Sequence, residues 1–496
     1  MNTLDQQALR GVVERVLADL GKAPAAAPAP KPAEAPAKNE KSCGCSCNGS
    51  GAGKEGVFGC VDLAAEAAHD AFLKLKKLGV DGRRRAIEIV KGVCATNKEE
   101  WGRFELAETK IGRLDHKIAK LDIMDRVPGV EWLRPDAMSG DSGITLEEFA
   151  PFGVVGAILP VTHSVPTLTG NVINMVAAGN SVLFNPHPGG AKSAALAVRE
   201  YNRAIKRELG IDNLICTIEE PSIESFDLIC KNEQVAIMAI TGGPAVVKAA
   251  MKSGKRSICA GPGNPVVVVD ESADLARAAR CVIEGGAFDN NLLCIGEKVV
   301  FVVGSVFNRF MEEMAKAGAA RLNGSQLERL TAEAFTIKEG EGGGCAQAVL
   351  NRDLIGADAR VLAQKAGASV PDHCELVFAE TDADHPYVQK EQMMPMLPIV
   401  SVPDFETGVE LAKQAEHGYR HSAIIHSTNV GHMTHMGREM DTTLFVKNGA
   451  CVTGLGLGGE GYLSYSIATT TGEGITTPKT FTRVRRCVMV ENLRIV

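Results

Sequence analysis

Cys294 is the residue of this chain best placed to do chemistry. It lies between a predicted helix at 275–284 and an apolar stretch at 299–303 that predicts a buried strand. A thiol at the entrance of a strand is held rigidly while one side stays open, and a thiolate is the strongest side-chain nucleophile near neutral pH. The alternative is a buried, inert cysteine, which is the commoner role of a free cysteine.

Bulk composition is that of an ordinary globular protein. With 496 residues, 45% hydrophobic and 23% charged, the chain is long enough for two or three domains. The net charge of −7 and the lack of a basic stripe interleaved with aromatic residues argue against nucleic acid as a partner. Acidic residues interrupt the first twenty positions and no apolar run of about 18 residues occurs, so we expect no signal peptide, no membrane span and a cytosolic location.

Residues 4–20 predict a short amphipathic helix. The apolar residues that share one helical face are Leu9, Val12, Val13, Val16, Leu17 and Leu20. The following stretch, 23–38, is almost wholly Ala, Pro, Lys and Glu and is expected to stay extended. We therefore expect a helix at 1–21 tethered by a linker at 22–55, with its apolar face either docked on a partner or folded back on its own domain.

Fourteen cysteines without the spacing of a disulfide framework indicate free thiols in a reducing compartment. Three of them, Cys43, Cys45 and Cys47, occupy alternate positions inside the linker. A soft metal ion would need a fourth ligand, and neither a fourth cysteine nor a histidine lies near them. We expect no metal site here, and a redox-sensitive cluster and a cluster without function both stay open.

The body of the chain predicts an α/β fold. Helices are expected at 61–78 and 83–108, with breaks at Gly79 and Gly82. Short apolar runs then alternate with helical patterns, which predicts right-handed parallel crossovers and a doubly wound sheet. The expected strands of this first set are 154–159, 181–184, 214–218 and 235–240, and the helices are 168–178, 191–208 and 222–231. A second set begins at 266–269 and continues through 299–303, 424–425 and 444–446, which predicts two α/β domains with a cleft between them.

One strand-to-helix turn in the first set contains two glycines, at Thr241-Gly242-Gly243. Glycines let backbone amides and a helix N-terminus approach a pyrophosphate closely. Taken alone the turn is a weak indication, because any tight turn between a strand and a helix can use glycine.

Several motifs in order make the chain resemble the aldehyde dehydrogenase superfamily over residues 56–496. The first are Pro-Phe-Gly-Val-Val-Gly at 151–156, Ala-Ala-Gly-Asn-Ser-Val at 177–182, the Thr-Gly-Gly turn, and a cysteine about fifty residues beyond it. Five more resemble the branch that acylates coenzyme A, which includes the propionaldehyde and acetaldehyde dehydrogenases of bacterial microcompartments. They are the segments at 185–189, 261–265, 393–398, 421–427 and 456–461.

The resemblance implies a Rossmann-type cofactor domain at 56–134 and 153–260, a catalytic domain at 261–446, and oligomerisation strands at 135–152 and 477–496. It also implies that the Cys294 thiolate adds to an aldehyde, that a hydride passes to nicotinamide, and that an acyl thioester remains on the enzyme. Hydrolytic members carry a glutamate in a Glu-Leu-Gly-Gly segment, where it activates water. This chain has Cys259-Ala260-Gly261-Pro262 there, so thiolysis by coenzyme A is favoured over hydrolysis.

Further roles are implied residue by residue. The backbone amide of Cys294 and a side chain from the loop at 160–163 would form an oxyanion hole. Most members have an asparagine in this loop, and this chain offers Thr162 and His163 as the catalytic donors; a histidine bonded only to backbone is the alternative for His163. The residues expected to bind the cofactor are Pro160, Asn185, His187, Thr241, Gly242, Gly243 and Glu391. Because Asn185 and His187 replace a lysine that would face a 2′-phosphate, we expect NAD as the cofactor.

The resemblance also bears on partners and on location. Cargo enzymes of microcompartments often carry a tethered amphipathic helix, so we expect residues 4–20 to bind a shell protein and the protein to reside inside a bacterial microcompartment in the cytoplasm. We expect a homodimer or homotetramer, and a short-chain aldehyde as substrate, with propionaldehyde first and acetaldehyde second. Two rival functions stay open: a hydrolytic aldehyde dehydrogenase that forms a carboxylate, and a non-enzymatic assembly protein that keeps the fold.

Overall fold

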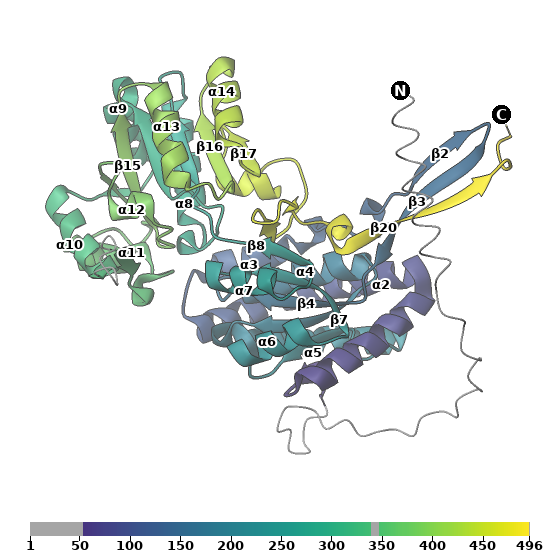
Figure 1. Ribbon diagram of the computed structural model, residues 1–496. Coiled ribbons are helices and arrows are strands. Elements are labelled where there is room, and N and C mark those ends of the chain that lie inside the picture. Colours follow the sequence, from purple (N-terminus) through teal and green to yellow (C-terminus); the bar gives the residue numbers. More distant parts are fainter. Residues whose placement is uncertain (1–52, 339–346, 496) are drawn as a thin grey trace, which may run out of the picture. The chain divides into compact units, whose positions relative to one another are not determined.

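A six-stranded parallel sheet forms the first half of the fold, in the order β1-β6-β5-β4-β7-β8 (Figure 1). Its strands are β1 (Val57–Phe58), β4 (Val154–Leu159), β5 (Ser181–Pro186), β6 (Ile215–Ile218), β7 (Val235–Thr241) and β8 (Ser257–Ala260). Every residue of β4 and β5 is buried, which explains why these strands are continuous apolar runs with helices on both sides. The computed structural model describes residues 53–338 and 347–495.

The expectations for residues 1–21, for most of the linker and for Cys43, Cys45 and Cys47 fall outside the described residues. The first helix in the described part of the chain is α2 (Val61–Thr109). The others around the first sheet are α3 (Leu114–Asp122), α4 (Ser164–Ala177), α5 (Ala191–Leu209), α6 (Ile223–Lys231) and α7 (Pro244–Lys252). Gly79 interrupts α2 as predicted, with φ +66° and ψ −154°, whereas the predicted break at Gly82 is wrong because that residue is helical and buried.

The chain reverses direction within the first sheet between β4 and β7. From β4 it winds outward through β5 and β6, and then returns to the other side of β4 to form β7 and β8. At such a switch point the loops after the two strands diverge and leave a crevice at their carboxyl ends. The loop that begins at Pro160 and the turn at Thr241 therefore lie at the same crevice.

A seven-stranded parallel sheet forms the second half, in the order β11-β14-β15-β10-β9-β16-β17. Its strands are β9 (Val266–Val269), β10 (Val299–Val303), β11 (Ala320–Arg321), β14 (Val377–Glu380), β15 (Met396–Val402), β16 (Ser422–His426) and β17 (Leu444–Lys447). Its helices are α8 (Leu275–Ala287), α9 (Gly304–Lys316), α10 (Gly324–Ala334), α11 (Ala359–Ala366), α12 (Pro386–Gln389), α13 (Phe405–Glu416) and α14 (Val430–Met440). The α/β prediction with parallel sheets is confirmed.

Three small antiparallel sheets complete the described chain. In the largest, β2 (Asp136–Gly140) and β20 (Thr482–Val490) pair with the two edges of β3 (Gly143–Pro151), and this sheet projects from the rest of the fold (Figure 1). The others are the pair β12 (Phe335–Lys338) and β13 (Gln347–Leu350) and the pair β18 (Ile467–Ala468) and β19 (Gly474–Ile475). Strands β2 and β3 lie within the predicted region 135–152, and β20 lies within the predicted region 477–496. The part of these strands in oligomerisation stays a prediction.

One buried cluster joins the two large sheets. It contains Val155 and Phe184 of the first sheet together with Val267 and Phe301 of the second, each fully buried. Tyr465 from the C-terminal segment belongs to the same cluster. No helix within residues 53–338 and 347–495 is long and apolar enough to cross a membrane.

Candidate active site

The nucleophile candidate stands after an unusual turn. Cys294 follows the 3₁₀ turn η4 (Phe288–Asn291) and precedes β10, as expected for a residue at the entrance of a strand. Asp289, Asn290 and Asn291 have φ values of +49°, +54° and +63°, a left-handed conformation that Asn and Asp tolerate better than other side chains. The Asn291 amide donates to the carbonyls of Gly286 (2.7 Å) and Glu297 (2.8 Å), so side-chain hydrogen bonds hold the turn that presents the cysteine.

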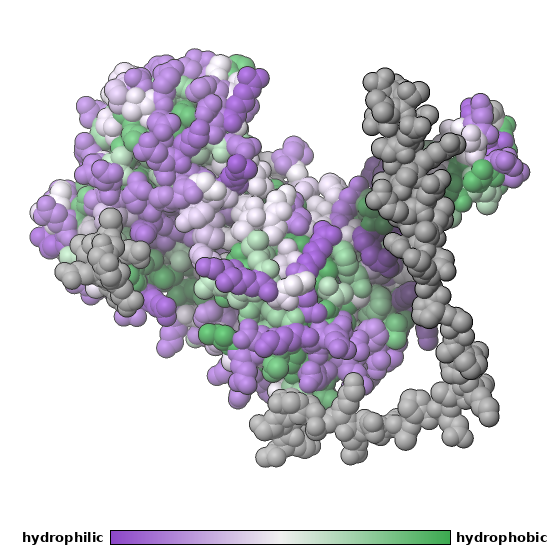
Figure 2. All heavy atoms as spheres, viewed as in Figure 1, coloured by the Kyte–Doolittle hydropathy of each residue, from purple (hydrophilic) through white to green (hydrophobic). Residues whose placement is uncertain are grey.

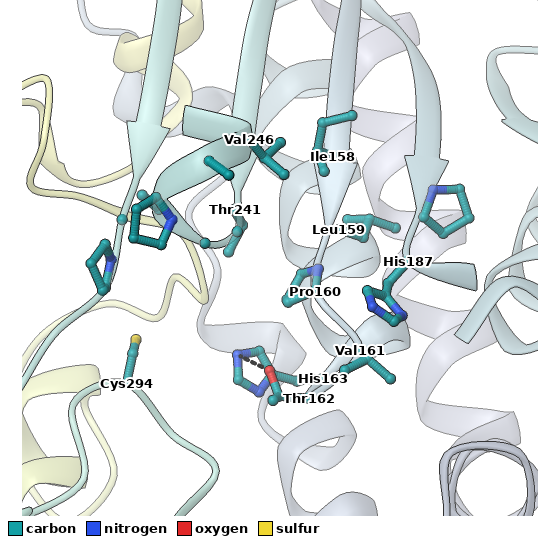
Figure 3. Close-up of a pocket in the computed structure, with 18 of the residues that line it drawn as sticks. Ile158, Leu159, Pro160, Val161, Thr162, His163, His187, Thr241, Val246 and Cys294 are labelled. Carbon is teal, nitrogen blue, oxygen red and sulfur yellow. Dashed lines mark hydrogen bonds between the residues drawn. The ribbon is translucent and has the colours of Figure 1, made fainter. Parts of the chain in front are cut away.

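Cys294 lines a cleft of about 670 Å³ between the carboxyl end of the first sheet and the amino end of the second. All ten predicted site residues line this cleft. In Figure 3, Cys294 lies on one side and His187 on the other, with Thr162 and His163 between them and Thr241 above. The structure therefore gathers residues that are up to 231 positions apart in sequence, from Pro160 to Glu391.

The surroundings of Cys294 disfavour its thiolate. Its side chain is half-buried, and burial raises its pKa to about 12, an effect that the Glu391 carboxylate increases. The charge of Lys298 and the backbone amides of Cys294 and Ile295 act in the opposite direction. Forming the thiolate therefore requires favourable charge near the sulfur.

Thr162 and His163 come from the loop after β4, directly before α4. Thr162 Oγ1 and His163 Nε2 are 3.3 Å apart, and His163 Nδ1 has no partner among the described residues. Burial and the nearby charges of Lys120 and Lys117 lower the pKa of His163 to about 3, so its imidazole is neutral. Either side chain can donate a hydrogen bond into the cleft, and neither is distinguished from the other by these contacts.

The Thr241-Gly242-Gly243 turn leads from β7 into α7, whose N-cap is Gly243. No heavy atom lies within 4 Å of the position that a Cβ of Gly243 would take, so the backbone at this turn is open. An open helix N-terminus at the end of a parallel strand suits a pyrophosphate group. The residues present thus fit a dinucleotide at this end of the cleft.

The opposite wall of the same end comes from β5 and the segment after it. Asn185 is fixed by α6, since its amide donates to the Ser222 carbonyl (3.2 Å) and its Oδ1 accepts from Ser225 Oγ (2.6 Å). His187 Nδ1 accepts from the Gly189 amide at 3.1 Å. No lysine or arginine is found among the described residues that line the cleft, and the carboxylates there are Asp227 and Glu391.

Glu391 precedes β15 and is half-buried beside the nucleophile. Burial raises its pKa to about 7, against the effect of Lys298 and of the Gly263 amide. Ala260, Gly261 and Pro262 also line the cleft. They occupy the segment where hydrolytic enzymes carry their glutamate, and they place no carboxyl group there.

The cleft also contains residues to which the sequence analysis gave no role, namely Leu292, Met393, His421, Tyr465 and Ile467. His421 is buried, its Nδ1 lies 2.8 Å from Ser422 Oγ, and its Nε2 has no partner among the described residues. Burial and the charge of Lys298 lower its pKa to about 4, so it is neutral at neutral pH. A histidine three residues before the predicted strand at 424–425 is the sequence signal that could have identified it.

Comparisons with known proteins agree with this arrangement. The model of the aldehyde dehydrogenase family matches residues 52–460. Acetaldehyde dehydrogenase (acetylating) EutE of Salmonella typhimurium is 43% identical over 443 residues, which are 89% of this chain and 94% of that protein.

Two solved structures are similar over 89% of this chain and 100% of their own. One is a propionaldehyde dehydrogenase from the fucose utilisation microcompartment of Clostridium phytofermentans (41% identity, TM-score 0.85). The other is a Rhodopseudomonas palustris propionaldehyde dehydrogenase with bound CoA and an acylated cysteine (40% identity, TM-score 0.86). The resemblance inferred from the motifs is confirmed, and the chain belongs to the aldehyde dehydrogenase family.

Proposed function

We propose that the protein is a CoA-acylating aldehyde dehydrogenase, which converts a short-chain aldehyde, NAD and coenzyme A into an acyl-CoA and NADH. The observation that carries this proposal is that Cys294 lines the same cleft as Ala260-Gly261-Pro262, a segment that offers no carboxylate. A covalent acyl group on Cys294 then lacks the base that would activate water. A thiol needs less activation than water to attack a thioester, so the acyl group passes to coenzyme A.

The chain's own residues account for the first half of the reaction. The thiolate of Cys294 adds to the aldehyde carbon, and the carbonyl oxygen becomes an oxyanion. The Cys294 amide and a donor from Thr162 or His163 stabilise that oxyanion, and loss of one such donor typically costs about a hundred- to a thousandfold in rate. The Thr241-Gly242-Gly243 turn would hold NAD, which would supply the hydride acceptor, and loss of the hydride would leave the acyl group on Cys294 as a thioester.

Acyl transfer is the second half. The sulfur of coenzyme A attacks the thioester carbon, the bond to Cys294 breaks, and Cys294 leaves as a thiolate. His421 is positioned to take the proton of the attacking thiol, because its Nε2 is unpartnered, neutral and in the wall of the cleft. Glu391, which lines the same cleft, orients the nicotinamide ribose.

The lining of the cleft supports an uncharged, short aldehyde. Near Cys294 the walls include Leu292, Tyr465 and Ile467, and no cation lines the cleft within the described residues. An aldehyde with a sulfonate or carboxylate would lose its hydration without gaining a partner. We place propionaldehyde first and acetaldehyde second. The same lack of cations around Asn185 and His187, together with Asp227, favours NAD over NADP.

The test is the dependence of product on coenzyme A. Purified protein with propionaldehyde and NAD should form NADH continuously only when coenzyme A is present, and mass spectrometry should identify propionyl-CoA. Cys294→Ala should abolish NADH formation, and His421→Ala should release about one equivalent of NADH per active site and then stall. Equal release of free propionate without coenzyme A would establish the hydrolytic function instead, and unchanged NADH formation in Cys294→Ala would exclude this mechanism.

We further propose a domain division and two partners. The first sheet and its helices form the cofactor domain (56–134 and 153–260), the second sheet forms the catalytic domain (261–446), and β2, β3 and β20 join subunits into a homodimer or homotetramer. Residues 4–20 bind a shell protein and bring the enzyme into a microcompartment. The support for this location is that a relative 41% identical comes from a microcompartment.

A further inference from the structure

Lys298 is a buried lysine without a carboxylate partner; burial lowers its pKa, and the charges of Glu391 and Cys294 oppose that shift. Its side chain is fully buried, and its Nζ donates to the carbonyls of Asn291 (2.8 Å) and Leu293 (3.2 Å) and to Asn291 Oδ1. Across the described residues, no carboxylate oxygen lies within 4.0 Å of this ammonium. The two other fully buried lysines differ, because Lys117 pairs with Glu105 at 3.4 Å and Lys120 pairs with Asp289 at 2.5 Å.

Burying a charge is costly unless an opposite charge or several dipoles compensate it. Three carbonyl oxygens compensate Lys298 only partly, since none of them carries a full negative charge. A fold that keeps such a cation has a use for its field at that point. The reaction creates a negative charge at Cys294, and the Leu293 carbonyl that binds Lys298 belongs to the residue directly before this cysteine. The charges of Lys298 and Cys294 stabilise each other.

We propose that the Lys298 ammonium is the counter-ion of the thiolate of Cys294, both when this thiolate attacks the aldehyde and when it leaves from the thioester. Lys298 acts through the cysteine and is therefore a positioning residue, with no contact to the substrate. The inference rests on the proposed function only in naming Cys294 as the nucleophile.

Other ionisable groups face the same ammonium. They are Glu391, in the cleft; Glu297, next in sequence; Cys451, at the start of the turn η6 (Cys451–Leu455); and His421, before β16. Glu391 opposes ionisation of the cysteine, whereas Lys298 favours it. Without Lys298, the sulfur would face the carboxylate with no compensating charge.

The experiment measures the reactivity of Cys294 without aldehyde, NAD or coenzyme A. Full-length wild type, Lys298→Gln and Lys298→Met are treated with iodoacetamide over a series of pH values, and mass spectrometry follows alkylation of the peptide that contains Cys294. We expect both variants to lower the rate of alkylation at each pH of the series, by about tenfold or more at neutral pH. Lys117→Gln is the matched control, equally buried but paired with Glu105, and its rate of alkylation at Cys294 should equal that of the wild type.

Lys298→Gln separates charge from hydrogen bonding, because its amide can still donate to the turn. A wild-type rate of alkylation in Lys298→Gln would overturn the proposal and leave Lys298 as a hydrogen-bonding residue of the turn. If the Lys298 variants do not fold, Glu391→Gln is alkylated with iodoacetate and with iodoacetamide. A cation at Lys298 attracts the anionic reagent, so the rate with iodoacetate divided by the rate with iodoacetamide should be higher at Cys294 than at the thiol of free glutathione. An equal or lower ratio at Cys294 would contradict the proposal. The alkylation assay contains no coenzyme A, so its result does not depend on whether the protein acylates coenzyme A. The proposed function is tested separately.

Discussion

At the scale of single residues, Glu297 shows how the site uses burial. Its Oε1 accepts from the Cys451 amide at 2.8 Å, its Oε2 has no partner among the described residues, and burial raises its pKa to about 7. Since the ordinary value is 4.5, the folded protein binds this proton more tightly than the unfolded chain does. The ionised Glu297 therefore lowers the free energy of unfolding above pH 7, and this destabilisation disappears as the pH falls from 7 to 4.5.

Glu297→Gln removes that destabilisation, because an amide stays neutral at every pH. We expect the variant to exceed the wild type in free energy of unfolding by up to about 3 kcal/mol above pH 7, and to match it below pH 4.5. Urea unfolding at a series of pH values measures the difference. A constant difference across the whole series would contradict the assignment of a raised pKa.

The residues of the cleft were predictable to different degrees. Cys294, Thr162, Glu391 and the glycine turn stand in motifs whose order in the chain is informative, and the structure brings all of them to one cleft. Lys298 and Tyr465 could not be found this way. Lys298 is bonded within its own segment, and no motif of the sequence indicates that it is buried. The position of Tyr465 depends on packing between distant segments, since it donates to the Lys120 carbonyl at 3.2 Å.

At the scale of elements, the break in α2 depends on one glycine. Gly79 combines φ +66° with ψ −154°, a region that side chains with a Cβ avoid, although no atom lies within 4 Å of the position of its Cβ. Gly92 lies in the same helix with equally open surroundings and a regular helical backbone. The two glycines therefore differ in backbone conformation alone.

We expect opposite effects from the same substitution at these two positions. Gly79→Ala should destabilise the protein by about 1–3 kcal/mol, because alanine must adopt a strained conformation or straighten the helix. Gly92→Ala should stabilise it by about 0.5–1 kcal/mol through helix propensity. Thermal unfolding of the two variants decides, and an unchanged or higher stability of Gly79→Ala would show that the break does not require glycine.

The elements that the sequence analysis missed have physical explanations. β15 contains Pro398 between β14 and β10, and a proline inside an apolar run argues against a central strand. β14 has four residues and ends in a glutamate, which is too little for a pattern. The helix predicted at 168–178 begins earlier, at Ser164, because His163 is its N-cap and the whole first turn is buried.

At the scale of the whole molecule, β20 presents an apolar surface on an edge strand. Val484, Val488 and Val490 alternate along it and are 58–61% exposed, and Figure 2 shows apolar atoms on this projecting sheet. An exposed edge strand of this kind is unfavourable unless another chain covers it. This supports the proposed homodimer or homotetramer.

A charge on that surface should separate the subunits. Val484→Glu is expected to shift the protein towards monomers in analytical ultracentrifugation, because a carboxylate would be buried at the interface without a partner. Arg485→Glu, the next residue and on the other face of β20, is the control and should keep the oligomer. A monomeric wild type, or an unchanged oligomer in Val484→Glu, would remove the assigned interface.

The segment 4–20, predicted to form a tethered helix, should be separable from catalysis. Every residue that lines the cleft lies between Ile158 and Ile467, so deletion of residues 1–21 is expected to leave kcat unchanged within about twofold. The same deletion should abolish co-purification with microcompartment shells, because the apolar face of the helix is lost. Co-purification that persists after the deletion would place the shell contact elsewhere.

The late position of the last wall of the cleft has a consequence for biosynthesis. Tyr465 and Ile467 complete that wall, and β20 then pairs along its length with β3, which the ribosome made more than three hundred residues earlier. The nascent chain carries Cys294 long before these segments emerge. Until translation nears its end, the thiol has no enclosed environment, and the polypeptide cannot consume aldehyde before its synthesis is almost finished.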